Sequence, residues 1–175
     1  MITPKIVLDS FKTVRDNTIE IARDIPEEKY SFRPAEGAQT VLEMFQGIIR
    51  TTEFMTTISL AKEPVVVTPE TRTEVFAKNT QTNLAEVTTK AQVIAALESS
   101  LAGIIARVEA VPESFLNESF VAPDNATKIR LWVVNCAKEQ EMSVRAQLYL
   151  TERMVGIVPH TTRRQLEAQA KAAKA

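Results

Sequence analysis

The sequence predicts an all-α fold, a bundle of four long helices. Apolar residues recur every three or four positions through four long segments, which is the spacing of amphipathic helices. Only 4 glycines and 8 prolines occur, and they fall mainly between those segments. No stretch alternates apolar and polar residues as a strand would, and no internal repeat is visible.

The first two helices have clear start signals. Thr3 followed by Pro4 predicts a helix that runs to about Asp24. Thr40, with Glu43 three residues later, forms a capping-box sequence for a second helix that ends near residue 63. This second helix is apolar over most of its circumference, so we expect it to be central.

The second half of the chain predicts two more helices. Thr89 and Gln92 form another capping-box sequence, for a third helix that runs to Pro112. Asp124 or Asn125 is expected to cap a fourth helix over about 127–155, which ends before a glycine. We expect 1–160 to form the bundle and 161–175, polar and rich in alanine, to form a helix-prone tail. Residues 65–89 are expected to form a long crossover that covers one end of the bundle.

Composition sets limits on partners and location. With 21 basic and 22 acidic residues the net charge is −1, which gives no general field for nucleic acid or a membrane surface. A single cysteine, Cys136, allows no internal disulfide and suits a reducing compartment. No apolar run approaches the roughly 20 residues of a membrane span. We therefore expect a cytoplasmic protein that binds neither nucleic acid nor membrane.

Three stretches together resemble the DinB (YfiT-like) superfamily. "IPEEKYSFRPAEGAQTVLEM" is similar to the family's segment before and into its second helix, and "GIIRTTEFM" carries a matching glutamate, Glu53. "EQEMSVRAQLYLTERMVGIVP" resembles the family's H-E-x-x-H-R-G-Q-L ending, and six of its residues match. These six are Glu141, Arg145, Gln147, Leu148, Gly156 and Pro159.

The resemblance implies an up-down-down-up four-helix bundle with a long crossover between helices two and three, often as a homodimer. In many members three histidines bind a divalent metal in a cleft at the end of the bundle. Some of those members transfer a small thiol such as mycothiol, with the metal as a Lewis acid that lowers the pKa of the thiol.

The three histidine positions of the family fall here on Gly47, Gln140 and Val144. Glycine and valine have no side-chain donor, and a lone glutamine oxygen is a poor ligand for a transition metal. The only histidine, His160, lies outside the motif and is expected in an exposed loop. We therefore expect no metal and no cofactor, and this puts conventional metal-dependent catalysis in doubt.

The same region provides the candidate pocket. Its expected residues are Gln46, Gly47, Glu53, Cys136, Gln140, Glu141, Val144 and Gln147.

Each of these residues also has a structural interpretation. Gln140, on a core-facing stripe, could bond a backbone carbonyl or Gln46 instead of a ligand. Val144 and Cys136 fit the core, and Gly47 could allow close helix packing or leave room for a molecule.

The two glutamates and the two large aromatic residues leave similar alternatives. Glu141 could pair with Arg145 one turn later, or approach Glu53 to hold a cation or a ligand. Trp132 and Tyr149 are expected in core or dimer contacts.

Three functions remain open. The first is a bundle without the metal site that binds a small molecule in the end cleft or has no catalytic role. The second is a thiol-dependent transferase with atypical ligands or no metal. The third is a homodimeric interaction module.

Overall fold

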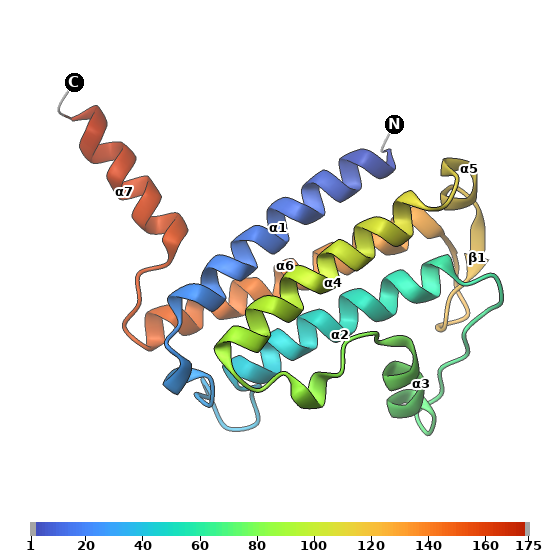
Figure 1. The fold of residues 1–175 in the computed structure, drawn as a ribbon, viewed down its shortest axis with the longest axis horizontal. Coiled ribbons are helices and arrows are strands. Elements are labelled where there is room, and N and C mark those ends of the chain that lie inside the picture. The colour runs from blue at the N-terminus through green and yellow to red at the C-terminus, as the bar shows by residue number, and fades with distance from the viewer. Residues whose placement is uncertain (1–2, 174–175) are drawn as a thin grey trace.

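The computed structural model describes residues 3–173 and is mostly helical, which confirms the predicted class. Four long helices lie side by side (Figure 1). In them α1 contacts α4 and α6, and α2 contacts the same two helices. The elements are α1 (Pro4–Asp24), α2 (Val41–Leu60), α3 (Arg72–Asn79), α4 (Lys90–Glu109), α5 (Glu113–Leu116), β1 (Ser119–Val121), β2 (Thr127–Ile129), α6 (Arg130–Met154) and α7 (His160–Ala172).

The predicted helix starts are confirmed at atomic detail. The Thr3 hydroxyl accepts a hydrogen bond in the first turn of α1. Thr40 and Glu43 form a complete capping box at α2, and Thr89 and Gln92 form another at α4. Each box satisfies two backbone groups that the first turn leaves free. The local sequence therefore determines where three of the long helices begin.

The start of α6 differs from the prediction. Thr127–Ile129 pairs with Ser119–Val121 as a short antiparallel hairpin, so the helix begins at Arg130. Asp124 does not cap the helix, because its side chain accepts from the backbone N–H of Ala126 inside the hairpin turn. Asn125 occupies the left-handed region of that turn at φ 60°. Both expected caps therefore close a turn, as asparagine and aspartate commonly do.

The connection from α1 to α2 is ordered by one aromatic residue. Tyr30 is buried, and its hydroxyl donates to the carbonyl of Ala22 at 3.0 Å, near the end of α1. Its ring lies 5.7 Å from that of Phe45 in α2. The backbone N–H of Leu42 donates to the carbonyl of Tyr30. These contacts dock the Tyr30 side chain between the end of α1 and the start of α2.

The crossover between α2 and α4 lies along α2. Its helix, α3, packs beside the C-terminal half of α2, where Phe54 and Ile58 contact Phe76 and other apolar residues of the crossover. The crossover then returns through a short 3-10 turn at Leu84–Glu86 to the start of α4. It thereby forms a wall beside α2, which the candidate site uses.

Among the described residues, α4 alone has both the length and the apolar composition of a membrane span. This corrects the expectation that no segment approaches that length. The helix contacts both α1 and α2, and its apolar stripe, which includes Val93, Leu97, Leu101 and Ile104, is buried in the bundle. Packing of the helical core is therefore enough to account for its composition.

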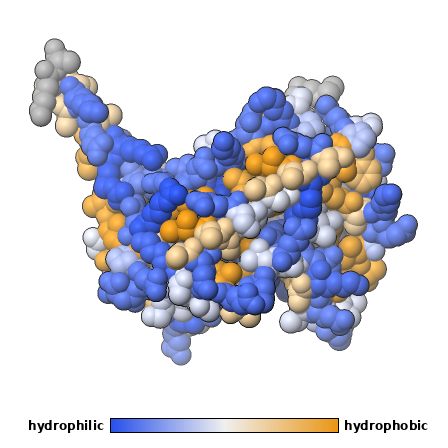
Figure 2. All heavy atoms as spheres, in the orientation of Figure 1, coloured by the Kyte–Doolittle hydropathy of each residue, from blue (hydrophilic) through white to orange (hydrophobic). Residues whose placement is uncertain are grey.

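The last helix, α7, projects from the bundle (Figure 1). Its first residue, His160, is buried, whereas every residue from Arg164 to Ala173 is exposed. Figure 2 shows α7 as mainly hydrophilic. The predicted helical propensity of the tail is confirmed, and only the first turn of the helix is attached to the bundle.

Candidate functional site

A surface groove of about 910 Å³ lies between α2, α3 and the segment 80–85. The lower edge of the molecule is notched between α3 and this segment in Figure 2. This volume is in the range of sites for small molecules. The lining residues are Arg50, Thr51, Phe54, Met55, Arg72, Thr73, Phe76, Ala77, Thr80, Gln81, Thr82, Asn83, Leu84, Ala85 and Gln140.

One wall of the groove is aromatic. The rings of Phe54 in α2 and Phe76 in α3 stack with their centroids 3.9 Å apart and their planes 12° apart. The guanidinium of Arg72 lies over the Phe76 ring, 5.6 Å from its centroid. Met55 and Leu84 extend the apolar lining. The groove therefore combines apolar surface with a small number of charged and polar groups.

Glu53 positions the segment that forms the opposite wall. One carboxylate oxygen accepts from the backbone N–H groups of Gln81 at 2.7 Å and Thr82 at 2.9 Å, and the other accepts from the Thr82 hydroxyl at 2.7 Å. Glu53 is only 2% exposed. Its oxygens are used by the protein, so Glu53 supports the groove from behind and does not line it.

Gln46 provides a second attachment. Its amide nitrogen donates to the carbonyls of Leu84 at 3.3 Å and Val87 at 2.9 Å. Because Gln46 and Glu53 lie two turns apart on α2, they hold the 80–87 segment at two points. The sequence interpretation named both residues as pocket residues, whereas the structure gives them a positioning role.

The three positions at which the sequence resemblance places the family's histidines lie in different surroundings. A Cβ on Gly47 would meet only the Gln39 side chain, at 3.7 Å, so this glycine leaves room and does not mark a close approach of two helices. Val144 is half-buried against the main core. Gln140 is exposed and lines the groove, so its expected place on a core-facing stripe is wrong. The buried side of α6 passes instead through Ala137 and Glu141.

Glu141 has a partner that the sequence interpretation missed. It is 1% exposed, and it accepts three hydrogen bonds from the fully buried Arg15 of α1 at 2.9–3.0 Å. The expected pairs of Glu141 with Arg145 and with Glu53 are therefore wrong, because Arg145 donates to the carbonyl of Val14 instead. Glu53 instead accepts hydrogen bonds from Gln81 and Thr82 of the crossover.

Every N–H group of Arg15 has a partner. In addition to Glu141, the guanidinium donates to the carbonyl of Leu97, the hydroxyl of Ser100 and the hydroxyl of Thr52. These partners come from α2, α4 and α6, so one side chain of α1 joins all four long helices. A buried charge of this kind is tolerated only when it is fully paired. No exposed atom remains on it to meet a ligand.

The remaining candidate residues of α6 lie outside the groove. Cys136 is half-buried, and burial, followed by the nearby charge of Glu139, raises the pKa of its thiol. A raised pKa disfavours the thiolate that a nucleophile or a metal ligand requires. Gln147 is exposed and does not line the groove. Of the eight predicted pocket residues, Gln140 is therefore the one that lines the groove.

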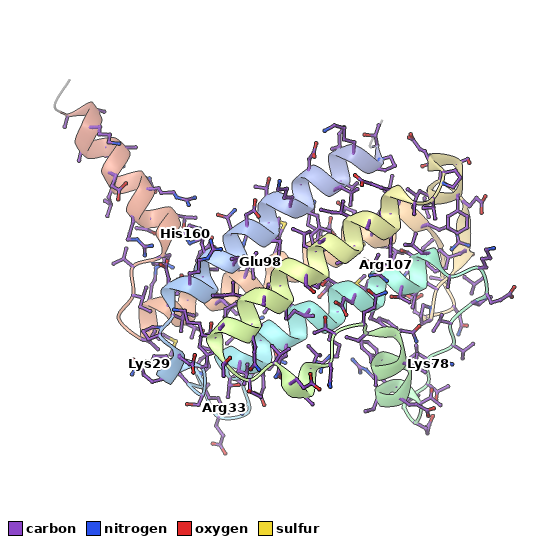
Figure 3. The ribbon with its side chains drawn as sticks, viewed as in Figure 1. Lys29, Arg33, Lys78, Glu98, Arg107 and His160 are labelled. Atoms are coloured by element: carbon purple, nitrogen blue, oxygen red, sulfur yellow. The ribbon has the colours of Figure 1, made fainter. Side chains whose placement is uncertain are left out.

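A second polar cluster lies where α7 joins the bundle. His160 is 2% exposed, so its predicted exposed position is wrong, and one ring nitrogen lies 2.9 Å from the amide oxygen of Asn17. Figure 3 shows His160 at the base of α7. Arg163 donates to both carboxylate oxygens of Asp24 at 2.8 and 2.9 Å. These contacts attach the first turn of α7 to the end of α1.

Glu152 in this cluster is completely buried, and neither of its carboxylate oxygens has a hydrogen-bond partner within residues 3–173. Burial, with the nearby charge of Asp24, raises the pKa of Glu152 to about 7. Burial, with the nearby Arg164, lowers the pKa of His160. His160 therefore favours its neutral form near neutral pH, whereas Glu152 changes its protonation state in that range.

Trp132 and Tyr149, expected in core or dimer contacts, lie in different surroundings. Trp132 is 51% exposed, so it is not a core residue, and Lys128 lies over its ring. Tyr149 is half-buried, with its ring 5.7 Å from that of His160. Neither residue lines the groove.

The donor chemistry does not suit a divalent metal. Across residues 3–173, no three His, Cys, Asp or Glu side chains are placed to hold one ion together. The groove itself is lined by no histidine, cysteine or carboxylate. Two cationic side chains, Arg50 and Arg72, line it instead. A divalent cation would meet repulsion and no anionic ligand there.

Comparison with known proteins identifies the family. The sequence profile of the DinB superfamily matches residues 10–142, which is most of the chain. The chain belongs to the DinB superfamily. The sequence resemblance to this superfamily is therefore confirmed. No curated protein matches the chain in sequence.

Two solved structures share the DinB fold. A DinB-like protein, YjoA, from Bacillus subtilis aligns with a TM-score of 0.64 at 18% identity, over 86% of this chain and 91% of that one. A mutant of a mycothiol-dependent maleylpyruvate isomerase aligns with a TM-score of 0.56 at 12% identity. The alignment covers 88% of this chain and 61% of the isomerase chain. At these identities the likeness concerns the fold.

Proposed function

We propose that this DinB protein binds a small molecule in the groove beside α2 and works without the three-histidine metal site of its family. The proposal rests on the groove itself, which is large enough for a metabolite and is lined by both apolar and polar side chains. The wall opposite α2 is held by Glu53 and Gln46, so the site is largely formed before a ligand arrives.

The family's metal does not fit the residues present, which supports a non-catalytic reading. Gly47 and Val144 offer no donor, and Gln140 offers one amide oxygen at the groove surface. A metal site of this class needs about three imidazole or carboxylate ligands.

The test is a metal and ligand assay on one preparation. We expect protein purified without chelator to carry far less than one zinc, nickel or manganese ion per chain by elemental analysis. We also expect a library of small metabolites to yield compounds that raise the melting temperature, as ligands of the folded state must. Stoichiometric divalent metal would overturn the proposal. Thr73→Trp places a large side chain in the groove, so ligand binding that this variant leaves unchanged would also overturn it.

Thiol-dependent transfer is a second candidate. The isomerase that shares the fold is mycothiol-dependent, which favours this alternative. Without a metal, the chain would have to lower the pKa of a bound thiol with a cationic group, and Arg50 and Arg72 are the cationic groups of the groove. Thiol transfer would be supported if the wild-type protein conjugates a thiol to an electrophile and Arg50→Gln lowers the rate of that reaction. Activity equal to buffer would refute it.

We also propose that the protein forms a homodimer and that its helices have the up-down-down-up order of the family. In Figure 1, α1 and α6 run in one direction and α2 and α4 in the other, which supports this order. Met142, Leu150 and Met154 are 41–60% exposed at multiples of four residues on α6. A stripe of this kind can pack against its own copy across a two-fold axis. Light scattering should give twice the chain mass, and Leu150→Asp should give a monomer; a monomeric wild type would refute the dimer.

A further inference from the structure

The groove beside α2 has a charge that differs from that of the whole chain. The sequence has a net charge of −1, yet the two charged residues that line the groove are both arginines. Arg50 comes from α2 and Arg72 from the first turn of α3, and both are exposed. Two cationic groups from separate elements therefore meet at the one apolar groove described above.

Neither arginine has an anionic partner within residues 3–173. The ion pairs of that part of the chain involve neither Arg50 nor Arg72, and no side-chain hydrogen bond from either guanidinium is present. Arg72 instead lies over the ring of Phe76. Two other exposed arginines are paired, Arg23 with Glu20 and Glu98 and Arg33 with Glu43, whereas exposed Arg153 and Arg164 form no ion pair among the described residues.

The buried carboxylate behind the groove wall, Glu53, is already occupied. Glu53 lies behind the wall of the groove, where its two oxygens accept three hydrogen bonds from Gln81 and Thr82. It also lies near Arg107 of α4, where burial lowers the pKa of the guanidinium and the charge of Glu53 opposes that shift. Arg107 reaches α2 by donating to Thr57, and Figure 3 labels it on α4. The charge of Glu53 is therefore used inside the protein and is not available to the groove arginines.

We propose that the groove binds an anionic small molecule with an apolar body, with Arg50 and Arg72 as the residues that recognise the anionic group. The inference rests on the ligand-binding function proposed above and adds its chemical class. A carboxylate or a phosphate accepts forked hydrogen bonds from a guanidinium, and a planar body finds apolar surface on Phe54, Phe76 and Leu84. The contact of Arg72 with the Phe76 ring keeps its guanidinium beside that apolar surface.

The test uses calorimetric titration of the full chain with three related probes. Naphthoate carries a carboxylate, naphthyl phosphate carries a phosphate, and naphthalenemethanol is neutral. We expect at least one anionic probe to bind about tenfold more tightly than the neutral one, and the stronger of the two distinguishes a carboxylate ligand from a phosphate ligand. Raising the salt concentration should weaken anion binding and leave neutral binding unchanged.

Matched variants separate recognition from net charge. Arg50→Gln and Arg72→Gln should each weaken binding of the preferred anion about tenfold. Lys78→Gln is the control, because Lys78 lies on the same helix as Arg72, is exposed and does not line the groove. It should leave binding unchanged. An equal loss in Lys78→Gln would overturn the inference, since the effect would then belong to overall charge.

Two further outcomes distinguish the inference from the function on which it rests. Equal affinity for the neutral and anionic probes, abolished by Thr73→Trp, would overturn the anionic class and leave a ligand-binding groove in place. A second outcome is that no probe binds, or that Thr73→Trp leaves the binding of every probe unchanged. That outcome would overturn the groove as a binding site, and the inference with it.

Discussion

Removal of the carboxylate at Glu141 tests the account of the buried core. Glu141→Gln keeps the shape of the side chain but takes away the charge that faces Arg15, which is completely buried. The change replaces an oxygen that accepts from Arg15 at 2.9 Å with an amide that donates toward the guanidinium. Breaking a buried ion pair by removing one partner costs about 3–5 kcal/mol. We expect that loss in the free energy of unfolding.

The structure also predicts a milder effect when both charges are removed. The hydroxyls around Arg15 have other acceptors: Thr18 donates to Val14, Thr52 to Ile48, and Ser100 to Leu97. In Arg15→Met combined with Glu141→Leu, these groups therefore stay paired and no charge is left buried. Apolar replacement of a buried pair is often neutral or stabilising. The double variant should be more stable than Glu141→Gln alone.

The assay is urea unfolding followed by circular dichroism, with a thermal melt alongside. For a chain of this size a loss of 3–5 kcal/mol lowers the melting temperature by roughly 6–20 °C. Asp9→Asn is the control, because the Lys5–Asp9 pair is 83% and 65% exposed and should not change the midpoint. The reasoning is refuted if Glu141→Gln costs less than about 1 kcal/mol, or if the double variant is the less stable of the two.

Three more predictions concern the rest of the molecule. Because the pKa of Glu152 is raised from 4.5 to about 7, the native state holds a proton that the unfolded chain releases, so its contribution to stability is lost as pH rises between these values. Urea titrations should therefore show Glu152→Gln gaining about 3 kcal/mol on wild type between pH 4 and pH 8, and a constant difference would contradict the burial of this carboxylate. Glu53→Gln should speed amide hydrogen exchange at Gln81 and Thr82 at least tenfold, with Glu86→Gln as control, and unchanged exchange would show that Glu53 does not hold this wall. Histidines at the three family positions should create zinc binding near one ion per chain, measured after dialysis, and no gain would mean that the residues do not correspond to the family's ligands. The changes are Gly47→His, Gln140→His and Val144→His.

The sequence predicted the helices well because their determinants are local. Thr40 with Glu43 and Thr89 with Gln92 are short motifs whose hydrogen bonds close within one turn. The hairpin at 119–129 was missed because each strand has only three residues, too few for alternation to be visible. Asp124 suits both a helix cap and a turn, and only the pairing of the strands decides between them.

The candidate site was predicted only in part because its contacts are distant in sequence. Glu53 and Gln46 were recognised as important positions, but their partners lie in the crossover, which has no strong pattern of its own. Arg15 gave one usable signal. It lies between Phe11 and Ala22 on the apolar stripe of α1, where a charged residue requires a buried counter-charge. Periodicity could therefore find the position, although it could not name Glu141 as the partner.

The attachment of α7 through its first turn has a practical consequence. From Arg164 onward the described part of this helix is exposed, and in Figure 1 it points away from the side of the molecule that carries α3. A fluorophore placed at Gln169 would report the tumbling of the protein, and a coupling group at the same residue would attach the chain to a surface. Neither label would enter the groove. Trypsin should trim the same helix in native protein while leaving the four packed helices intact, so limited digestion offers a simple route to a shorter crystallisation sample.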